Sequence, residues 1–176
     1  SDAYALAVDA PHADNAYAFI NFMTSAESNA KLAVELGSGA VGVLSARAAL
    51  GLRTRVIGVV SSHAPAYALS IHQRTLVTHP STTKLAEGVA CSTPHPDALA
   101  LLMSHLDDII TVDDDEALAA MRTLHQHTGT VVEASAALPL AALKKTNPRA
   151  QSAGLILTGG NVSEALAKQC QSLSPT

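Results

Sequence analysis

The sequence is poor in aromatic residues: only 3% are Phe, Trp or Tyr, and tryptophan is absent. A protein that stacks the bases of single-stranded nucleic acid needs several such rings, so this class is disfavoured. The chain has no run of basic residues, and 11 Lys and Arg against 15 Asp and Glu give a net charge of -4. We therefore expect no nucleic-acid partner of any kind.

Cysteine and long apolar runs are also scarce. Cys91 and Cys170 lie far apart in the sequence and form no CxxC motif, and no histidine stands in a metal-ligand pattern. Metal and thiol catalysis therefore have little support. The chain contains no run of about 18 apolar residues, the length that a membrane helix requires, and no basic leader segment. We expect a cytoplasmic protein with no membrane partner.

Apolar residues, by contrast, are abundant: they make up 48% of the 176 residues, which is enough to bury the core of one compact unit. With so few rings, this core must consist of Ala, Leu, Val and Ile. Short apolar runs predict strands at 4–8, 54–60, 109–112 and 154–158. Periodic apolar residues predict helices at 14–24, 25–36, 39–50, 64–73, 96–106, 113–128, 131–145 and from about 162. This alternation predicts an α/β fold of three layers, a mostly parallel sheet with helices on both faces, which is Rossmann-like.

Local signals mark the ends of several predicted helices. Asp113 is placed to cap the helix that follows, and the acids after it suit the positive end of the helix dipole. Gly51 and Gly129 stand where two helices would end. Pro139 either breaks or restarts the alanine-rich helix that contains it.

Three segments carry residues that could take part in chemistry. The glycine-rich segment 37–42 leads into a predicted helix, so it is either a cup for a phosphate group or a helix end followed by a tight turn. Thr158 ends a predicted strand before two glycines and Asn161, which is either a ligand-binding edge or an ordinary turn capped by Asn161. Glu133 stands in an apolar stretch and is paired, exposed or functional, with exposure favoured.

From residue 37 to about 161 the sequence resembles one family. The matching segments, in the family's order, are TRVIGV (54–59), TKLAEGVA (83–90), DDIITV with a following acid and Ala-Met (107–121), VEASAA (132–137) and LTGGNV (157–162). Together they resemble the threonine dehydratase and serine racemase group of fold-type-II pyridoxal-phosphate (PLP) enzymes. Each segment alone is short, and the combination is specific.

The resemblance implies roles for particular residues. It implies that the glycine loop, Gly37, Ser38, Gly39 and Ala40, cups the cofactor phosphate. It implies that the Thr158 hydroxyl bonds the pyridine nitrogen and that Glu133 lies near the cofactor ring. Glu87 lies in a segment that in the family often helps to hold a cation, which makes it the one candidate metal ligand.

The departures from this family concern catalysis. Its members are about twice as long, and their N-terminal half carries the Schiff-base lysine and a loop that grips the substrate. Neither motif occurs here, and none of the lysines, Lys31, Lys84, Lys144, Lys145 and Lys168, stands in the required context. We therefore predict no catalytic residue and no bound cofactor, with weak PLP or phosphate binding as the alternative.

The first 36 residues resemble a different family, the periplasmic spermidine- and putrescine-binding receptors. The resemblance rests on the segment ALAVDAPHADNAYAFINFM at 5–23, and residues 25–36 continue it. The chain therefore reads as a receptor-like arm at 1–36 joined to an enzyme-like domain at 37–176, which together form one compact unit. No polyamine-binding residue is carried over by the resemblance.

These observations predict a folded α/β chimera or fragment without catalytic activity of its own. Two alternatives stay open: a threonine or serine dehydratase-like protein that retains weak cofactor binding, and a binder of polyamine or another small ligand. Because the missing enzyme half would leave apolar surface uncovered, we also expect a homodimer or a higher oligomer.

Overall fold

The computed structural model describes residues 39–53, 55–146, 153–157 and 159–171. Within these residues two strands, β1 (Ile57–Ser61) and β2 (Asp108–Val112), pair in parallel, with Ile57 opposite Asp108 and Ser61 opposite Val112. Parallel strands need a long crossover connection. Here the crossover contains α4 (Ala66–Gln73), the 3-10 helix η1 (Glu87–Val89) and α5 (Pro96–His105).

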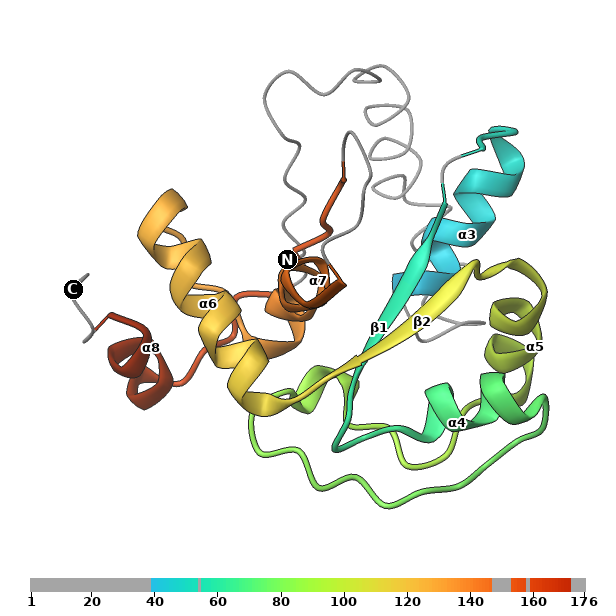
Figure 1. Cartoon of the computed structure of the whole chain (residues 1–176), viewed down its shortest axis with the longest axis horizontal. Coiled ribbons are helices and arrows are strands. Elements are labelled where there is room, and N and C mark those ends of the chain that lie inside the picture. The colour runs from blue at the N-terminus through green and yellow to red at the C-terminus, as the bar shows by residue number, and fades with distance from the viewer. Residues whose placement is uncertain (1–38, 54, 147–152, 158, 172–176) are drawn as a thin grey trace.

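Helices cover both faces of this sheet (Figure 1). On one side α7 (Ala134–Thr146) contacts both strands, α6 (Asp114–Thr128) packs on α7, and α8 (Glu164–Gln171) packs on α6. On the other side α4 contacts β2 and α5, and α3 (Gly39–Ala49) packs on α5. The fold is therefore α/β with a parallel sheet between helical layers, as the sequence predicted.

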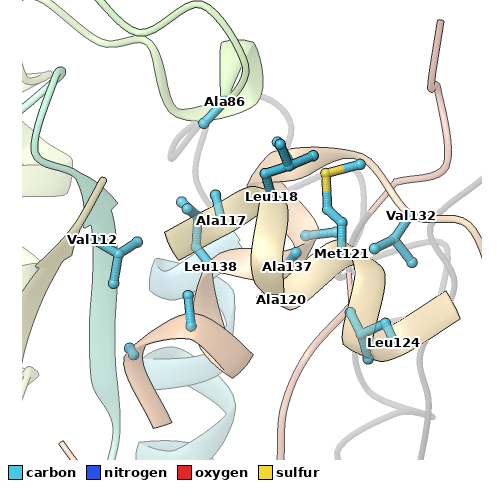
Figure 2. Close-up of a cluster of buried hydrophobic side chains, with 14 of the residues drawn as sticks. Ala86, Val112, Ala117, Leu118, Ala120, Met121, Leu124, Val132, Ala137 and Leu138 are labelled. Carbon is cyan, nitrogen blue, oxygen red and sulfur yellow. The ribbon is translucent and has the colours of Figure 1, made fainter. Parts of the chain in front are cut away.

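Among the described residues the core divides into two clusters of buried side chains, and alanine is frequent in the larger one. The larger cluster joins α6, α7 and β2, with Met121 and Leu138 1% exposed and Val112 fully buried (Figure 2). The smaller cluster joins α3 to α5 through Val41, Leu44, Ala98 and Leu102. Small side chains let helices approach closely, so α6 and α7 meet through alanines rather than through rings. The predicted aliphatic core is confirmed for the described residues.

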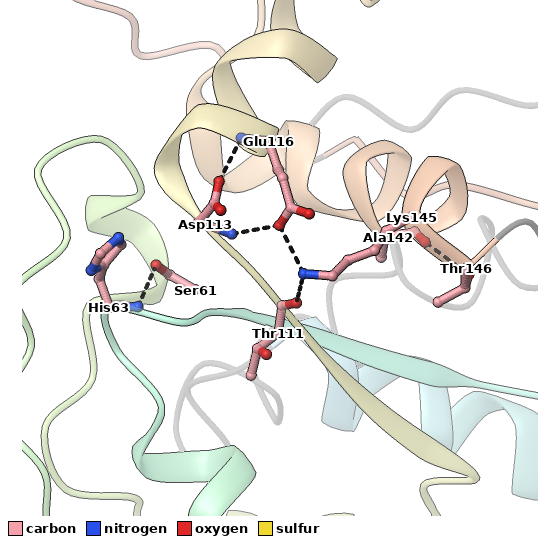
Figure 3. Close-up of polar contacts among 8 residues, drawn as sticks. All are labelled: Ser61, His63, Thr111, Asp113, Glu116, Ala142, Lys145 and Thr146. Atoms are coloured by element: carbon pink, nitrogen blue, oxygen red, sulfur yellow. Dashed lines mark hydrogen bonds and ion pairs between the residues drawn. The ribbon is translucent and has the colours of Figure 1, made fainter.

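Both ends of α6 follow the local signals in the sequence. The Glu116 amide donates to the Asp113 carboxylate at 2.7 Å, and the Asp113 amide donates to the Glu116 carboxylate at 2.8 Å (Figure 3). This reciprocal capping box satisfies two amides that a helix start leaves unpaired. Gly129 ends the helix with φ at 71°, a left-handed conformation that glycine adopts without a steric penalty.

Two of the predicted strands differ from the structure. The strand expected at 54–60 begins three residues later, at Ile57, and ends at Ser61. The strand expected at 154–158 is wrong over its described part, because residues 154–157 have no regular structure. Leu157 still packs against the larger core cluster, so its apolar character serves burial without strand pairing. The elements expected at 4–8, 14–24 and 25–36 lie outside the described residues.

Among the described helices, none has the length and apolar character to cross a membrane.

Candidate functional site

Three segments that are far apart in the sequence meet around the carboxylate of Glu133. We call Gly88, Glu133, Ser135 and Gly159 the Glu133 cluster. The Ser135 hydroxyl donates to Glu133 Oε1 at 2.5 Å, and the Glu133 amide approaches the Gly159 carbonyl oxygen at 3.5 Å. Glu133 immediately precedes α7, where the positive end of the helix dipole favours a carboxylate. Both Glu133 and Ser135 are half-buried, which corrects the expectation that Glu133 is exposed.

The two glycines of the cluster allow this close approach. A Cβ atom at Gly159 would lie 2.5 Å from the Glu133 Cδ atom, and the φ of Gly159 is +76°. A Cβ atom at Gly88 would lie 2.7 Å from the Ser135 hydroxyl oxygen and 3.2 Å from Glu133 Oε1. No side chain larger than hydrogen fits at either position unless its neighbours move. The carboxylate is therefore held between the backbone of η1 and that of the loop at Gly159.

A separate anchor fixes the segment that carries Gly88. The Thr83 hydroxyl donates to the Asp114 carboxylate at 2.8 Å, and the Lys84 amide donates to the same carboxylate at 3.0 Å. Thr83 Oγ1 in turn accepts from the Ala86 amide at 3.1 Å. Asp114 stands two residues after the end of β2. Its two bonds therefore fix the start of the segment that leads to η1 beside the carboxyl end of that strand.

Two further polar side chains near the carboxyl ends of the strands, Lys145 and Ser61, have structural partners. Lys145 donates to the Glu116 carboxylate at 3.0 Å and to the Thr111 carbonyl at 3.2 Å, which ties α7 to β2 and to the start of α6 (Figure 3). The Ser61 hydroxyl is fully buried and accepts from the His63 amide at 3.1 Å. Open α/β sheets usually bind ligands at this edge, yet these groups are already paired.

Only some of the predicted site residues are among those that the structure describes. Gly37, Ser38 and Thr158 lie outside the described residues, and so does the side chain of Glu87, whose backbone belongs to η1. Gly39 begins α3, and Ala40 packs against the smaller core cluster. The structure does bring the neighbours of two predicted residues to a third: Gly88 follows Glu87, Gly159 follows Thr158, and both lie close to Glu133. No group of three or more His, Cys, Asp or Glu side chains within the described residues could hold a metal ion.

Sequence reasoning missed Ser135 and Asp114 as residues that shape the site. Ser135 stands two residues after Glu133, a spacing at which a short hydroxyl side chain can bond a neighbouring group. The sequence marks Asp114 only as one of several acids that suit a helix start, and its bond to Thr83 joins residues 31 apart in the sequence. A signal for Ser135 was present in the sequence, whereas Asp114 offered none.

The described lysines do not bond the Glu133 cluster. Lys144 donates to Thr123 at 3.0 Å, and Lys168 pairs with Glu164 at 2.6 Å one helical turn earlier. Lys145 is occupied by Glu116 and Thr111, as described above. Lys84 is exposed, and only its backbone amide makes a bond to Asp114. Lys31 lies outside the described residues.

Comparison with known proteins identifies the family. A model of the pyridoxal-phosphate dependent enzymes matches residues 27–159, which is most of the chain. The chain belongs to this family. The match covers the whole of the Glu133 cluster, and it begins at residue 27, within the segment 1–36 that the sequence resemblance assigned to a different family.

Individual relatives agree with the family but are longer. The chain is 28% identical over 137 residues to the L-threonine ammonia-lyase of Geobacter sulfurreducens, which covers 76% of this chain and 34% of that protein. It is 34% identical over 112 residues to the catabolic L-threonine dehydratase TdcB of Escherichia coli, covering 62% of this chain and 34% of that protein.

Solved structures show the same fold. The T.th. threonine deaminase superimposes with a TM-score of 0.66 at 29% identity, covering 83% of this chain and 54% of that one. Maize serine racemase superimposes with a TM-score of 0.65 at 27% identity, covering 75% and 43%. The chain thus spans about a third to a half of the length of these relatives.

The described residues do not fit a cofactor held covalently by a lysine. The Glu133 cluster supplies a carboxylate, a hydroxyl and two glycine backbones, but none of the four described lysines bonds it. The family's chemistry depends on a lysine beside the cofactor aldehyde.

Proposed function

We propose that this chain is a folded α/β segment of a threonine dehydratase- or serine racemase-like enzyme and has no catalytic activity of its own. The observation that carries the proposal is the placement of the lysines, three of which are bonded to partners on α6, α8 or β2. The length supports it, since the chain covers only 34% of the Geobacter enzyme and 54% of the T.th. threonine deaminase chain.

One observation favours a second candidate function, a weak binding site for PLP or phosphate. The Glu133 carboxylate is held against the loop that contains Gly159, next to Thr158, to which the family resemblance assigns a bond with the cofactor ring. The family resemblance assigns the ring to Glu133 and Thr158 and assigns the phosphate to the glycine segment Gly37, Ser38, Gly39 and Ala40. Bound PLP would supply an electron sink for amino-acid chemistry.

An assay of 2-ketoacid formation tests the main proposal. The purified chain is incubated with L-threonine or L-serine, with and without added PLP. We expect no ketoacid above the buffer blank, because none of the described lysines bonds the Glu133 cluster and the sequence lacks the motif of the substrate-gripping loop. An exposed lysine, with a pKa of about 10.4, is almost fully protonated at neutral pH and is a poor substitute.

One outcome would contradict the main proposal, and another would support the second candidate function. Turnover that survives Thr158→Ala but disappears when one lysine is replaced would contradict the proposal and identify an unforeseen attachment residue. Yellow protein that keeps PLP after desalting, yet makes no ketoacid, would establish the second function instead.

The origin of residues 1–36 is a separate proposal. We propose that they derive from a polyamine-binding receptor and join the enzyme-like part near residues 36–39, which makes the chain a chimera. The receptor resemblance of residues 5–23 supports this, although the family match already begins at residue 27. Calorimetric titration with spermidine tests whether polyamine binding came with the segment, and we expect none, because the resemblance carries over no polyamine-binding residue.

The chain spans only about a third to a half of the length of its relatives, which bears on assembly. We propose that it forms a homodimer or a higher oligomer, because apolar surface that the rest of such an enzyme covers is usually buried against a partner. Light scattering at tens of micromolar tests this, and a monomeric mass at that concentration contradicts it.

A further inference from the structure

A hollow of about 160 Å³ lies at the amino end of β2, between the last turns of α4 and α5. Its floor is apolar and includes Leu102 and Ile109, which are 5% and 8% exposed, together with the half-buried Met103. Its rim is polar, with His72 and the charged Arg74 from the end of α4, and the charged Asp107 and Asp108 at the start of β2. None of its lining residues belongs to the Glu133 cluster.

Arg74 adopts an unusual backbone conformation at this rim. It caps the C-terminus of α4 with φ at 52° and ψ at 35°, and among the described residues it is the only non-glycine with positive φ. Glycine is the residue that such a cap favours, because a Cβ atom is strained there. The Arg74 side chain is exposed and makes no hydrogen bond or ion pair within the described part of the chain. The backbone strain at Arg74 and the lack of a side-chain partner among the described residues together indicate that the guanidinium binds a molecule outside this chain.

The other rim charges are unequally neutralised. Asp107 accepts from the Arg47 guanidinium and from the Val56 amide at 2.7 Å, so its charge is already compensated. The same two contacts, the amide foremost, lower the pKa of Asp107. Asp108 accepts only from the amide of Ile109, at 2.8 Å, and forms no ion pair among the described residues. The rim therefore presents one uncompensated cation, Arg74, and one uncompensated anion, Asp108.

We propose that this hollow binds a small zwitterion with an apolar body, the chemistry of a free apolar α-amino acid. A carboxylate pairs with the planar guanidinium of Arg74, an ammonium group pairs with Asp108, and the apolar body covers the floor. Pockets for drug-sized ligands measure about 300–1,000 Å³, so a hollow of 160 Å³ suits a ligand of amino-acid size rather than a nucleotide.

Methyl NMR on the full chain with labelled methionine tests this proposal, with L-leucine as the probe. Met103 lines the hollow, whereas Met121 lies in the larger core cluster and serves as the internal reference. We expect saturable movement of the Met103 signal alone, with a dissociation constant of about 1–10 mM for a ligand of nine heavy atoms. The analogues 4-methylpentanoate and 3-methylbutylamine, which each lack one charge, should bind about tenfold more weakly.

The variants separate charge recognition from folding. Arg74→Gly removes the guanidinium and suits the left-handed backbone, so it keeps the fold and should weaken leucine binding at least tenfold. Asp108→Asn keeps an oxygen for the Ile109 amide and should weaken binding similarly. Arg53→Gly, at an exposed arginine that does not line the hollow, is the matched control and should change nothing. The proposal is overturned by an unmoved Met103 signal at tens of millimolar leucine, by unchanged binding in Arg74→Gly, or by equal binding of either single-charge analogue.

Discussion

Replacing Gly159 by alanine tests the close packing of the Glu133 cluster. The φ of +76° costs an alanine about 1 kcal/mol relative to glycine. The new Cβ atom would also lie 2.5 Å from the Glu133 Cδ atom, well inside contact distance. Relief of such overlap typically costs about 1–3 kcal/mol. We therefore expect Gly159→Ala to lower the free energy of unfolding by about 2–4 kcal/mol in urea denaturation.

A double-mutant cycle separates the two causes. In Glu133→Ala the clashing carboxylate is gone, so Gly159→Ala in that background should cost only the backbone strain of about 1 kcal/mol. The coupling free energy between the two positions should thus be at least about 1 kcal/mol, because residues in contact are not additive. The single variant Glu133→Ala also loses the bond from Ser135, and the cycle subtracts that loss.

The matched control is the next residue along the chain. Gly160 lacks a positive φ, and a Cβ atom there meets nothing within 4 Å. Gly160→Ala should therefore change stability by less than about 0.5 kcal/mol. Additivity of Gly159→Ala and Glu133→Ala within about 0.5 kcal/mol would falsify the packing described for the cluster.

Two further predictions concern α6 and the cysteines. Asp113→Ala removes one half of the capping box and should destabilise the protein by about 0.5–2 kcal/mol in the same denaturation assay, whereas Asp113→Asn should retain most of the stability. Burial raises the pKa of Cys170, so ionising it opposes folding, and stability should fall as the pH rises above the ordinary thiol value of 9.0. In native protein a thiol reagent should label the half-exposed Cys91 first, and mass mapping that finds Cys170 labelled equally fast contradicts this.

The elements that the sequence predicted well are those with signals inside the element. The bounds of α6 follow from Asp113 and Gly129, which act through backbone amides and a left-handed φ within a few residues of the helix. The apolar run before Ser61 predicted β1 to within three residues at its start. These signals depend on local covalent geometry, so the sequence carries them without knowledge of the fold.

Elements that depend on distant partners were predicted less well. The sequence did not decide whether Pro139 breaks the helix that contains it. The structure shows one helix from Ala134 to Thr146 with Pro139 inside it. The contacts of α7 with both strands and with α6 offset the lost hydrogen bond, and these contacts come from other parts of the chain. Residues 154–157 show the opposite case, an apolar run that predicted a strand but finds no strand partner.

The candidate site shows the same division. Family resemblance assigned Glu133 and Thr158 to the same cofactor ring, and the structure brings Glu133 close to Gly159, the residue after Thr158. The approach of Gly88 to Glu133 was not predicted. The bond from Ser135 and the approach of two glycine backbones decide that the carboxylate is held rather than exposed. Both features depend on loop geometry, which neither periodicity nor composition encodes.

The two candidate small-molecule sites, the hollow and the Glu133 cluster, are connected to opposite ends of β2. Asp108, the first residue of β2, lies at the rim of the hollow, whereas Asp114, just beyond its last residue, anchors the segment that carries Gly88 to the Glu133 cluster. Five residues of strand rise about 16 Å, so a ligand in the hollow does not touch the cluster. Loss of leucine binding in Arg74→Gly should therefore leave any PLP binding unchanged, and Gly159→Ala should leave the Met103 response unchanged. Coupling between the two sites would contradict this independence and would mean that β2 transmits a change along its length.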